Sequence, residues 1–258
     1  MMRLALLGNP VGHSRSPAMH HAALAYHGVE GVYDAREVDA AQFTSAVSEI
    51  AAGTLTGVNV TMPHKSLAYA ASEVVSADAA MARSVNTMMV RDQRIVGIST
   101  DIPAIRSCWR RAELPADDVL ILGSGGAAAA ALVAVASIAV GRISVSARRQ
   151  GAAAQVLKSV GVTGSVVDWG DPFAGVIVNA TPLGMSAEEL PTPMAARSTG
   201  LFDMAYADRP TPAVILATEG GVPFVSGIDM LVEQAALSFE WWTGLPAPRH
   251  EMRIATGL

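Results

Sequence analysis

The stretch VLILGSGGAA, at residues 119–128, decides the fold of the second half of the chain. Its first four residues are apolar and indicate a buried strand, and GSGGAA at 123–128 matches the pattern G-x-G-x-x-A ahead of an alanine-rich helix. Glycines there allow a tight turn and a close approach of the backbone to a ligand. The N-terminus of the following helix presents free N–H groups, which suit a pyrophosphate. We therefore predict a dinucleotide-binding loop, with a glycine turn that binds nothing as the alternative.

A membrane span is a second interpretation of this region, because residues 119–141 carry no charge. The glycines in the middle of the stretch favour a strand, a turn and then a buried helix from about Ala127. Outward from this stretch, short apolar runs alternate with helical patterns along the whole chain, which predicts α/β architecture with parallel sheets. We expect strands at 3–7, 31–38, 57–61, 85–90, 94–98, 119–122, 142–147, 165–168, 176–179, 201–203 and 222–225. We expect helices at 17–27, 40–51, 64–73, 102–112, 127–139, 150–159, 211–219 and 228–243.

Composition excludes several classes of protein. The 258 residues are 51% hydrophobic and 16% charged, which is sufficient for a real core and excludes a disordered chain. The net charge of −5 and the lack of a long basic run make nucleic acid and membrane surfaces unexpected partners. The single Cys108 excludes an internal disulfide, and the N-terminal apolar run is too short for a signal peptide. We therefore expect a cytoplasmic protein.

The strand expected at 142–147 ends where the ribose of a bound dinucleotide lies. Chains that bind NAD usually place Asp or Glu there to accept hydrogen bonds from the 2′-hydroxyl. This chain has no acidic residue between Gly123 and Val167 and has Arg148 and Arg149 instead. Guanidinium groups suit a 2′-phosphate, because they are always charged and bind it in a bidentate manner. This pattern favours NADP, with a solvated basic turn as the alternative.

Polar residues after the expected strands of the first half point to a small hydroxylated, acidic ligand. Ser16 is explained as the N-cap of the helix that Pro17 begins, whereas Ser14 has no such structural explanation. Lys65 is one of two lysines among 18 basic residues, and a lysine can exchange a proton where an arginine cannot. Chance is the alternative for Lys65, and Lys158 is expected on a solvated helix face.

Asn86-Thr87 and Thr100-Asp101 add an amide, hydroxyls and a carboxylate at strand ends, although Asp101 could simply be a helix N-cap. The six histidines show no spacing typical of a metal site, and the consecutive His20 and His21 must face different sides of a helix. We expect no metal.

Taken together, these motifs resemble those of the shikimate dehydrogenase family over essentially the whole chain. The matching segments follow in the family's order and spacing: GNPVGHSRSP at 8–17, NVTMPHK at 59–65, SVNT at 84–87, GSGGA at 123–127, NATPLGM at 179–185, DMAY at 203–206, and GIDMLVEQA at 227–235 with FEWWTG at 239–244. The resemblance implies an α/β fold of two lobes, an N-terminal substrate domain (1–101 and 229–258) and a Rossmann-like NADP domain (102–228), with the C-terminal helix returning to the first lobe. We expect a small ligand between the two lobes.

The resemblance also implies roles for individual residues. Lys65 and Asp101 are implied to be the catalytic pair. The implied substrate contacts are Ser14, Ser16, Thr61, Asn86, Tyr206 and Gln234. The implied NADP contacts are Gly123, Ser124, Gly125, Gly126, Ala127, Ala147, Arg148, Arg149, Thr181, Met204 and Gly227. Of these, the residues alone do not suggest Tyr206 or Gln234.

The chain departs from the family's usual pattern in four places. Ser99 stands where Asn usually precedes Thr-Asp, and Ile102-Pro103 follows Asp101 in place of glycine. His21 replaces Asn, and Ala147-Arg148-Arg149 replaces Asn-Arg-Thr. The implied activity is the reversible NADP-dependent reduction of 3-dehydroshikimate to shikimate, a step toward chorismate and the aromatic amino acids, by a monomer or homodimer. Because Ser99 and Pro103 flank Asp101, quinate or aminoshikimate as substrate, and an inactive NADP-binding sensor, are the alternatives.

Overall fold

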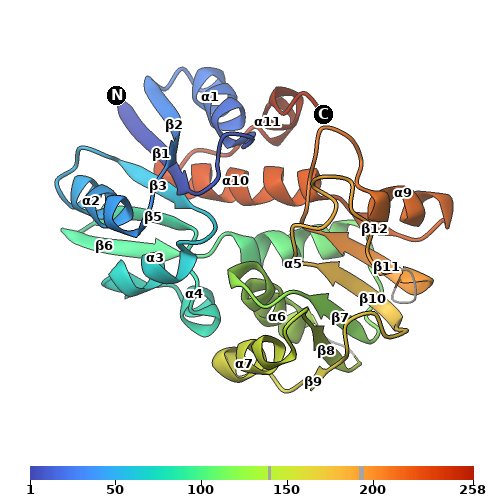
Figure 1. Ribbon diagram of the computed structural model, residues 1–258. Coiled ribbons are helices and arrows are strands. Elements are labelled where there is room, and N and C mark those ends of the chain that lie inside the picture. Colours follow the sequence, from blue (N-terminus) through green and yellow to red (C-terminus); the bar gives the residue numbers. More distant parts are fainter. Residues whose placement is uncertain (139–140, 192–194) are drawn as a thin grey trace. The chain divides into compact units, whose positions relative to one another are not determined.

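The computed structural model describes residues 1–138, 141–191 and 195–258, and the chain divides into two compact units. Unit 1 comprises residues 1–100 and 232–258, and unit 2 comprises residues 101–231. The elements of unit 1 are β1 (Met2–Gly8), α1 (Ser16–Tyr26), β2 (Gly31–Glu37), α2 (Ala40–Ala51), β3 (Gly57–Val60), α3 (Lys65–Ala71), β4 (Val74–Val75), α4 (Ala77–Ala82), β5 (Thr87–Arg91), β6 (Arg94–Ile98), the second part of α10 (Gly227–Thr243), and α11 (Arg249–Ala255) (Figure 1).

The strands of unit 1 form a sheet in the order β2-β1-β3-β5-β6-β4. β1 pairs in parallel with β2 and β3, whereas β5 runs antiparallel to both β3 and β6. The expectation of a purely parallel sheet is therefore wrong for this unit. β5 and β6 form a hairpin, and the three residues expected between them are too few for the crossover that parallel strands need.

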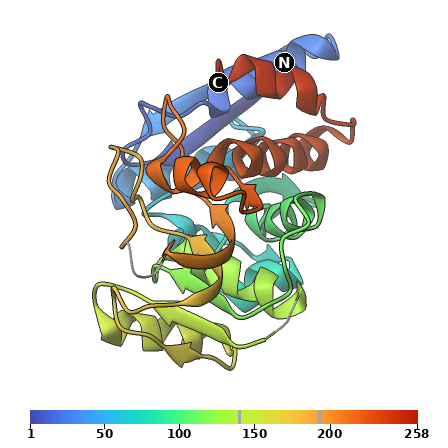
Figure 2. The ribbon, with the colours of Figure 1, turned by 90° about the vertical axis from the view of Figure 1, so that its right-hand side faces the viewer.

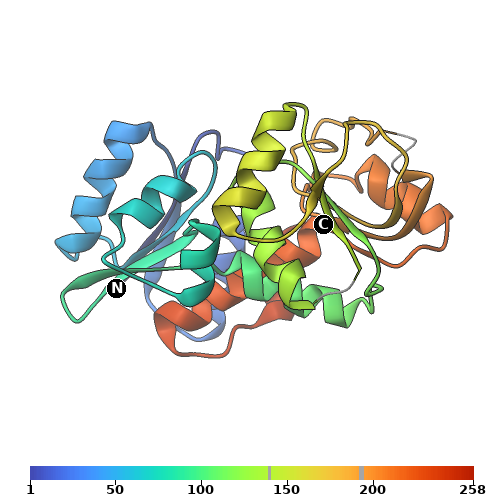
Figure 3. The ribbon, with the colours of Figure 1, turned by 90° about the horizontal axis from the view of Figure 1, so that it is seen from below.

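Helices cover both faces of the unit 1 sheet. Successive side chains of a strand point to opposite faces, so each strand contributes side chains to both packed faces. Ala5, Leu7 and Val58 pack with Phe43 of α2 on one face. Leu4, Leu6 and Tyr33 pack with Trp242 of α10 on the other. Figure 3 shows α2 and α10 on opposite sides of the strands. α11 is fixed to α10 by Arg249, whose guanidinium donates to the carboxylates of Glu233 and Glu240.

Unit 2 is a parallel sheet in the order β12-β11-β10-β7-β8-β9. Its elements are α5 (Asp101–Arg111), β7 (Val119–Leu122), α6 (Gly126–Ile138), β8 (Ile143–Ser146), α7 (Gln150–Val160), β9 (Ser165–Val166), β10 (Ala174–Asn179), β11 (Arg197–Asp203), α9 (Pro212–Glu219), β12 (Phe224–Val225) and the start of α10 (Figure 2). Leu120, Leu122 and Leu201 pack with Val214 of α9 on one face. On the other face, Phe202 stacks against Trp109 of α5 at 6.2 Å between ring centroids.

Within the described ranges, the expected elements do not include the short β4, α4 and α11. The uncharged stretch forms β7, a glycine turn and the 13-residue α6, as expected for a buried strand and helix. Among the described residues, no helix has the length and apolar character that crossing a membrane requires.

His20 is fully buried in unit 1 and makes the stability of the fold depend on pH. Its ring stacks on Tyr33 at 4.3 Å and lies 5.4 Å from the ring of Trp242. Burial, together with the neighbouring His21, lowers the pKa of His20 from 6.5 to about 3. Below pH 6.5 the unfolded chain binds a proton at His20 and the folded chain does not. Stability is therefore lost as the pH falls from 6.5, by about 1.4 kcal/mol for each pH unit well below that value.

We expect the free energy of unfolding of the wild-type chain to fall, between pH 7.5 and pH 5.5, by about 1.4 kcal/mol more than that of His20→Phe. Phenylalanine keeps the stacked ring and removes the titrating group. Urea unfolding at the two pH values measures the difference, with His250→Gln at an exposed position as the control that keeps the wild-type dependence. Equal losses in the wild type and His20→Phe would contradict the assignment.

Candidate functional site

The topology of unit 1 brings its polar loops to one edge of the sheet. β1, β3 and β6 all end at this edge, because β5 is antiparallel to its two neighbours. The same antiparallel direction makes β5 begin there. The segments that follow β1, β3 and β6, and the one that precedes β5, contain Ser14, Thr61, Thr100 and Asn86 respectively.

The loop after β1 places Ser14 and Ser16 together, but not in the roles first expected. α1 begins at Ser16 itself, so Arg15 is the N-cap and Ser16 is not. The Ser14 hydroxyl accepts a hydrogen bond from Ser16 N at 3.2 Å. Ser14 therefore has a structural role that the sequence did not indicate, because its hydroxyl satisfies a backbone N–H in the first turn of α1. Since a hydroxyl keeps its own proton when it accepts, Ser14 can still donate to a ligand.

Lys65 is the first residue of α3 and is partly buried. The loop that precedes it is held against the β1 loop, because Asn9 N donates to Met62 O at 2.9 Å. The carbonyl of Lys65 accepts from Val85 N at 3.1 Å, which joins Lys65 to the segment that carries Asn86. Backbone hydrogen bonds thus join the segments that carry Ser14, Thr61, Lys65 and Asn86 along one edge of the sheet.

Asn86 is held by Thr100. Its Oδ1 accepts from Thr100 N at 2.8 Å and its Nδ2 donates to Thr100 Oγ1 at 3.0 Å. Ser238 of α10 lies 3.2 Å from Thr100 Oγ1 and 3.0 Å from Thr87 Oγ1. Gln234 stands one turn before Ser238, on the same face of the helix. This places Gln234 toward the cluster formed by Asn86 and Thr100.

Asn59 was missed by the sequence analysis. It is buried beneath this cluster, where its Oδ1 accepts from the Tyr33 hydroxyl at 2.8 Å and its Nδ2 lies 3.0 Å from both Thr87 Oγ1 and Ser238 Oγ. Asp101, by contrast, belongs to unit 2 and is the first residue of α5. The helix therefore begins one residue earlier than expected, and Asp101 lies in its first turn rather than at the N-cap. A carboxylate in the first turn is favoured by the helix dipole. Ser99 is buried, and its hydroxyl has no hydrogen-bond partner in the part of the chain that is described.

Unit 2 gathers its predicted residues at the carboxyl ends of its parallel strands, where ligands bind in sheets of this kind. Gly123 follows β7 and has φ +118°, and a Cβ there would lie 2.8 Å from Ala180 O. A Cβ on Gly125 would meet no atom within 4 Å, so space remains beside the turn. α6 then begins at Gly126. A glycine turn with open space at a helix N-terminus fits a pyrophosphate.

The neighbouring strands supply the remaining predicted residues of unit 2. Ala147 is buried after β8, and Arg148 and Arg149 follow it with both side chains exposed. Two exposed guanidinium groups at this position fit a phosphate on the ribose. Thr181 follows β10, and Met204 and Tyr206 follow β11. Gly227 begins α10, where a Cβ would lie within 2.1 Å of Ala205 O, so the loop after β11 and the start of α10 are in close contact.

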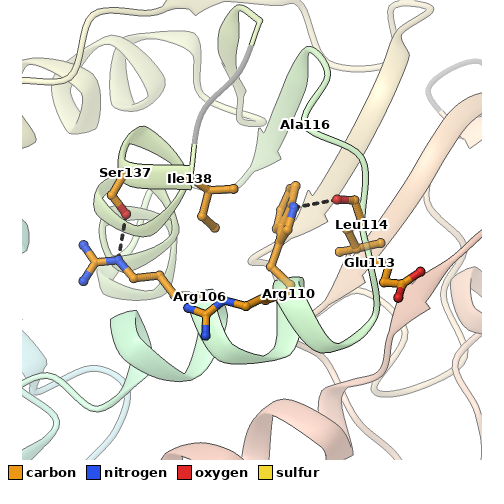
Figure 4. Close-up of a pocket in the computed structure, with 8 residues that line it drawn as sticks. Arg106, Arg110, Glu113, Leu114, Ala116, Ser137 and Ile138 are labelled. Carbon is orange, nitrogen blue, oxygen red and sulfur yellow. Dashed lines mark hydrogen bonds between the residues drawn. The ribbon is translucent and has the colours of Figure 1, made fainter.

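A pocket of about 470 Å³ in unit 2 lies away from this edge. Trp109 Nε1 donates to Leu114 O at 3.0 Å in its wall, and Figure 4 shows Arg106 donating to Ser137 Oγ. Ala116, which also lines the pocket, precedes the start of β7, whereas the dinucleotide loop follows its end. The pocket contains none of the predicted site residues. Over residues 1–138, 141–191 and 195–258, no three His, Cys, Asp or Glu side chains are grouped to hold a metal ion.

Comparison with known proteins agrees with this geometry. Residues 6–88 match the shikimate dehydrogenase substrate binding domain, and residues 227–254 match the shikimate 5′-dehydrogenase C-terminal domain. The NADP(+) shikimate dehydrogenase of Anaeromyxobacter sp. (strain Fw109-5) is 37% identical over 265 residues, covering 97% of this chain and 94% of that protein. The chain belongs to the shikimate dehydrogenase family.

Solved structures of the shikimate dehydrogenase family extend the likeness to the fold. The enzyme of Thermus thermophilus, in complex with NADP(H) and shikimate, has a TM-score of 0.88 at 32% identity. The comparison covers 100% of this chain and 99% of that one. The Mycobacterium tuberculosis shikimate dehydrogenase has a TM-score of 0.85, also at 32% identity. The expected α/β fold with a Rossmann-like unit is therefore confirmed.

Proposed function

We propose that this chain is an NADP-dependent dehydrogenase that interconverts 3-dehydroshikimate and shikimate. Unit 2 binds the dinucleotide through the loop at 123–127, with Arg148 and Arg149 at the 2′-phosphate. Unit 1 binds the substrate through the sheet edge that carries Ser14, Ser16, Thr61, Asn86 and Gln234. One observation carries the proposal: within each unit, residues scattered along the sequence lie at a single sheet edge.

The nicotinamide ring supplies or accepts the hydride when the cofactor is bound. Lys65 donates a proton to the substrate oxygen as the ketone is reduced, and removes that proton in the reverse direction. Asp101 supplies a carboxylate that accepts a hydrogen bond from the ammonium group or from the reacting hydroxyl. The hydroxyls of Ser14 and Ser16 donate to the substrate carboxylate, and these bonds are strong because the acceptor is charged. Tyr206 and Gln234 bind substrate hydroxyls.

Absorbance of the reduced nicotinamide tests this function, with shikimate, quinate and no substrate, each with NADP and with NAD. We expect rapid reduction with shikimate and NADP alone. Turnover with quinate or with NAD would contradict the proposed specificity and keep the reaction class. Binding of NADP without turnover of either substrate would contradict the proposed reaction and favour an inactive sensor or a dehydrogenase that acts on another substrate.

A further inference from the structure

Two buried polar residues join the loops that follow β10 and β11 in unit 2. Asn179 is the last residue of β10 and Asp203 is the last residue of β11, and the two are paired in register. Both are completely buried. Burial of an amide and a carboxylate is costly unless each finds hydrogen-bond partners, so their partners show what they hold in place.

Asn179 uses the full hydrogen-bonding capacity of its side chain. Its Oδ1 accepts from Thr181 N at 3.1 Å and from Thr181 Oγ1 at 2.6 Å. Its Nδ2 donates to Leu183 O at 2.9 Å and to Asp203 Oδ1 at 2.8 Å. Since an amide offers two N–H groups and two acceptor positions, no capacity remains for a ligand. The turn at 181–183 is therefore wrapped around this side chain.

Asp203 extends the same network in the other direction. Its Oδ1 also accepts from Ala205 N at 3.0 Å, and its Oδ2 accepts from the Thr211 hydroxyl at 2.5 Å. Thr211 is the N-cap of α9 and accepts from Val214 N. Burial raises the pKa of Asp203, against the effect of these hydrogen bonds. The carboxylate thus ties the loop at 204–206 both to α9 and to Asn179.

The geometry points to Asn179 and Asp203 as positioning residues for hydride transfer. They fix the loops at 181–185 and 204–206, which carry Thr181, Met204 and Tyr206. The loop at 181–185 lies next to the dinucleotide turn, because Ala180 N donates to Leu122 O and Ala180 O sits against Gly123. The loop at 204–206 is joined to the end of β10, because Met204 N donates to Asn179 O at 3.0 Å. This inference rests on the proposed function, in which those loops contact the nicotinamide end of NADP and the substrate. Buried networks that are fully satisfied specify one conformation, which is what a site for hydride transfer needs.

Alanine variants of Asn179 and Asp203 test the inference, with a binding readout that needs no turnover. We expect each variant to bind NADPH about tenfold more weakly and to lower kcat about 10²-fold. The reason is that displaced loops at 181–185 and 204–206 would misplace the reacting carbon of the nicotinamide relative to the substrate. Adenosine 2′,5′-bisphosphate carries the phosphates near Arg148 but no nicotinamide, so its affinity is expected to stay within about twofold. Calorimetric titration measures both affinities.

The matched control is Asp118→Ala, at the opposite edge of the same sheet. It removes the bonds that Asp118 accepts from Arg142 N, Nε and Nη2. We expect a lower melting temperature, with both affinities and kcat unchanged. Asp203→Asn keeps the shape of the side chain, so it is expected to fold even where Asp203→Ala does not. We expect it to lose less NADPH affinity than Asp203→Ala and to keep its affinity for adenosine 2′,5′-bisphosphate.

Parallel losses of NADPH and adenosine bisphosphate affinity would overturn the inference. So would a lower melting temperature with kcat and both affinities unchanged, since that pattern shows a purely structural role. Failure of the wild-type chain to oxidise shikimate would contradict the proposed function instead, because the comparison of the two affinities decides this inference without turnover.

Discussion

Replacing Lys65 by alanine is expected to lower kcat for the proposed oxidation of shikimate by about 10²–10⁴-fold, which is the contribution of a general acid–base group. Alanine favours the helix that begins at this position, and the bond from Val85 N to the backbone carbonyl of residue 65 does not depend on the side chain. The fold is therefore expected to remain intact. Initial rates at saturating NADP and shikimate measure the effect, and circular dichroism checks the fold.

The chain supplies its own control for this experiment. Lys158 is the only other lysine, and it lies exposed on α7 of unit 2. Lys158→Ala is expected to keep the wild-type rate. Lys65→Arg keeps the positive charge but cannot readily exchange a proton, so we expect it to be nearly as slow as Lys65→Ala. A Lys65→Ala chain with wild-type kcat would contradict the acid–base role.

Unit 2 was the easier unit to predict, for a physical reason. Its central strands β7 and β10 are almost entirely buried, so they read as continuous apolar runs such as 119–122, and Gly123 marks a turn with a positive φ directly after β7. β7, β8, β11 and β12 are each followed by a helix of at least eight residues, which is long enough to show its period. Such a pattern leaves little choice but parallel strands joined by helical crossovers.

The antiparallel direction of β5 in unit 1 was not predicted from the sequence. β5 and β6 are joined by Asp92 and Gln93, both with positive φ (49° and 61°). Positive φ at both central residues is typical of the tight turns that close hairpins, but the usual sequence signal is a glycine at the second position. Because Gln93 takes that place, the turn left no clear mark. The two-residue β4 and the short α4 and α11 are too brief to show a period at all.

Some residues of the candidate site could be predicted from the sequence and others could not. Loop motifs could be found because glycine, proline and rare lysine stand out in the sequence. Asn59, Ser238, Asn179 and Asp203 did not stand out as functional residues, because their importance depends on partners that only the folded chain supplies. Asn59 and Ser238 are 179 residues apart in the sequence and meet only because α10 returns to unit 1. A single buried polar residue in an apolar run, such as Asn179 after Val176-Ile177-Val178, was the signal available.

The double replacement of Arg148 and Arg149 by alanine is expected to weaken NADPH binding by about 10²-fold or more, while NADH binding changes by less than about threefold. Hydrogen bonds to charged groups contribute about 1.5–3 kcal/mol each, and the two cofactors differ only in the 2′-phosphate. Both arginines follow β8, whose last residue, Ser146, accepts from Gly123 N at 2.8 Å. The dinucleotide turn and the two guanidinium groups therefore stand on adjacent strand ends.

Fluorescence titration with NADPH and with NADH measures the two affinities, and Arg142→Ala serves as the control. Arg142 lies just before β8 begins, paired with Asp118, so its loss is expected to leave both affinities unchanged. Equal weakening of NADPH and NADH by the double replacement would contradict the phosphate role. That result would mean that the arginines support the turn itself, because only contact with the 2′-phosphate can separate two ligands that are otherwise identical.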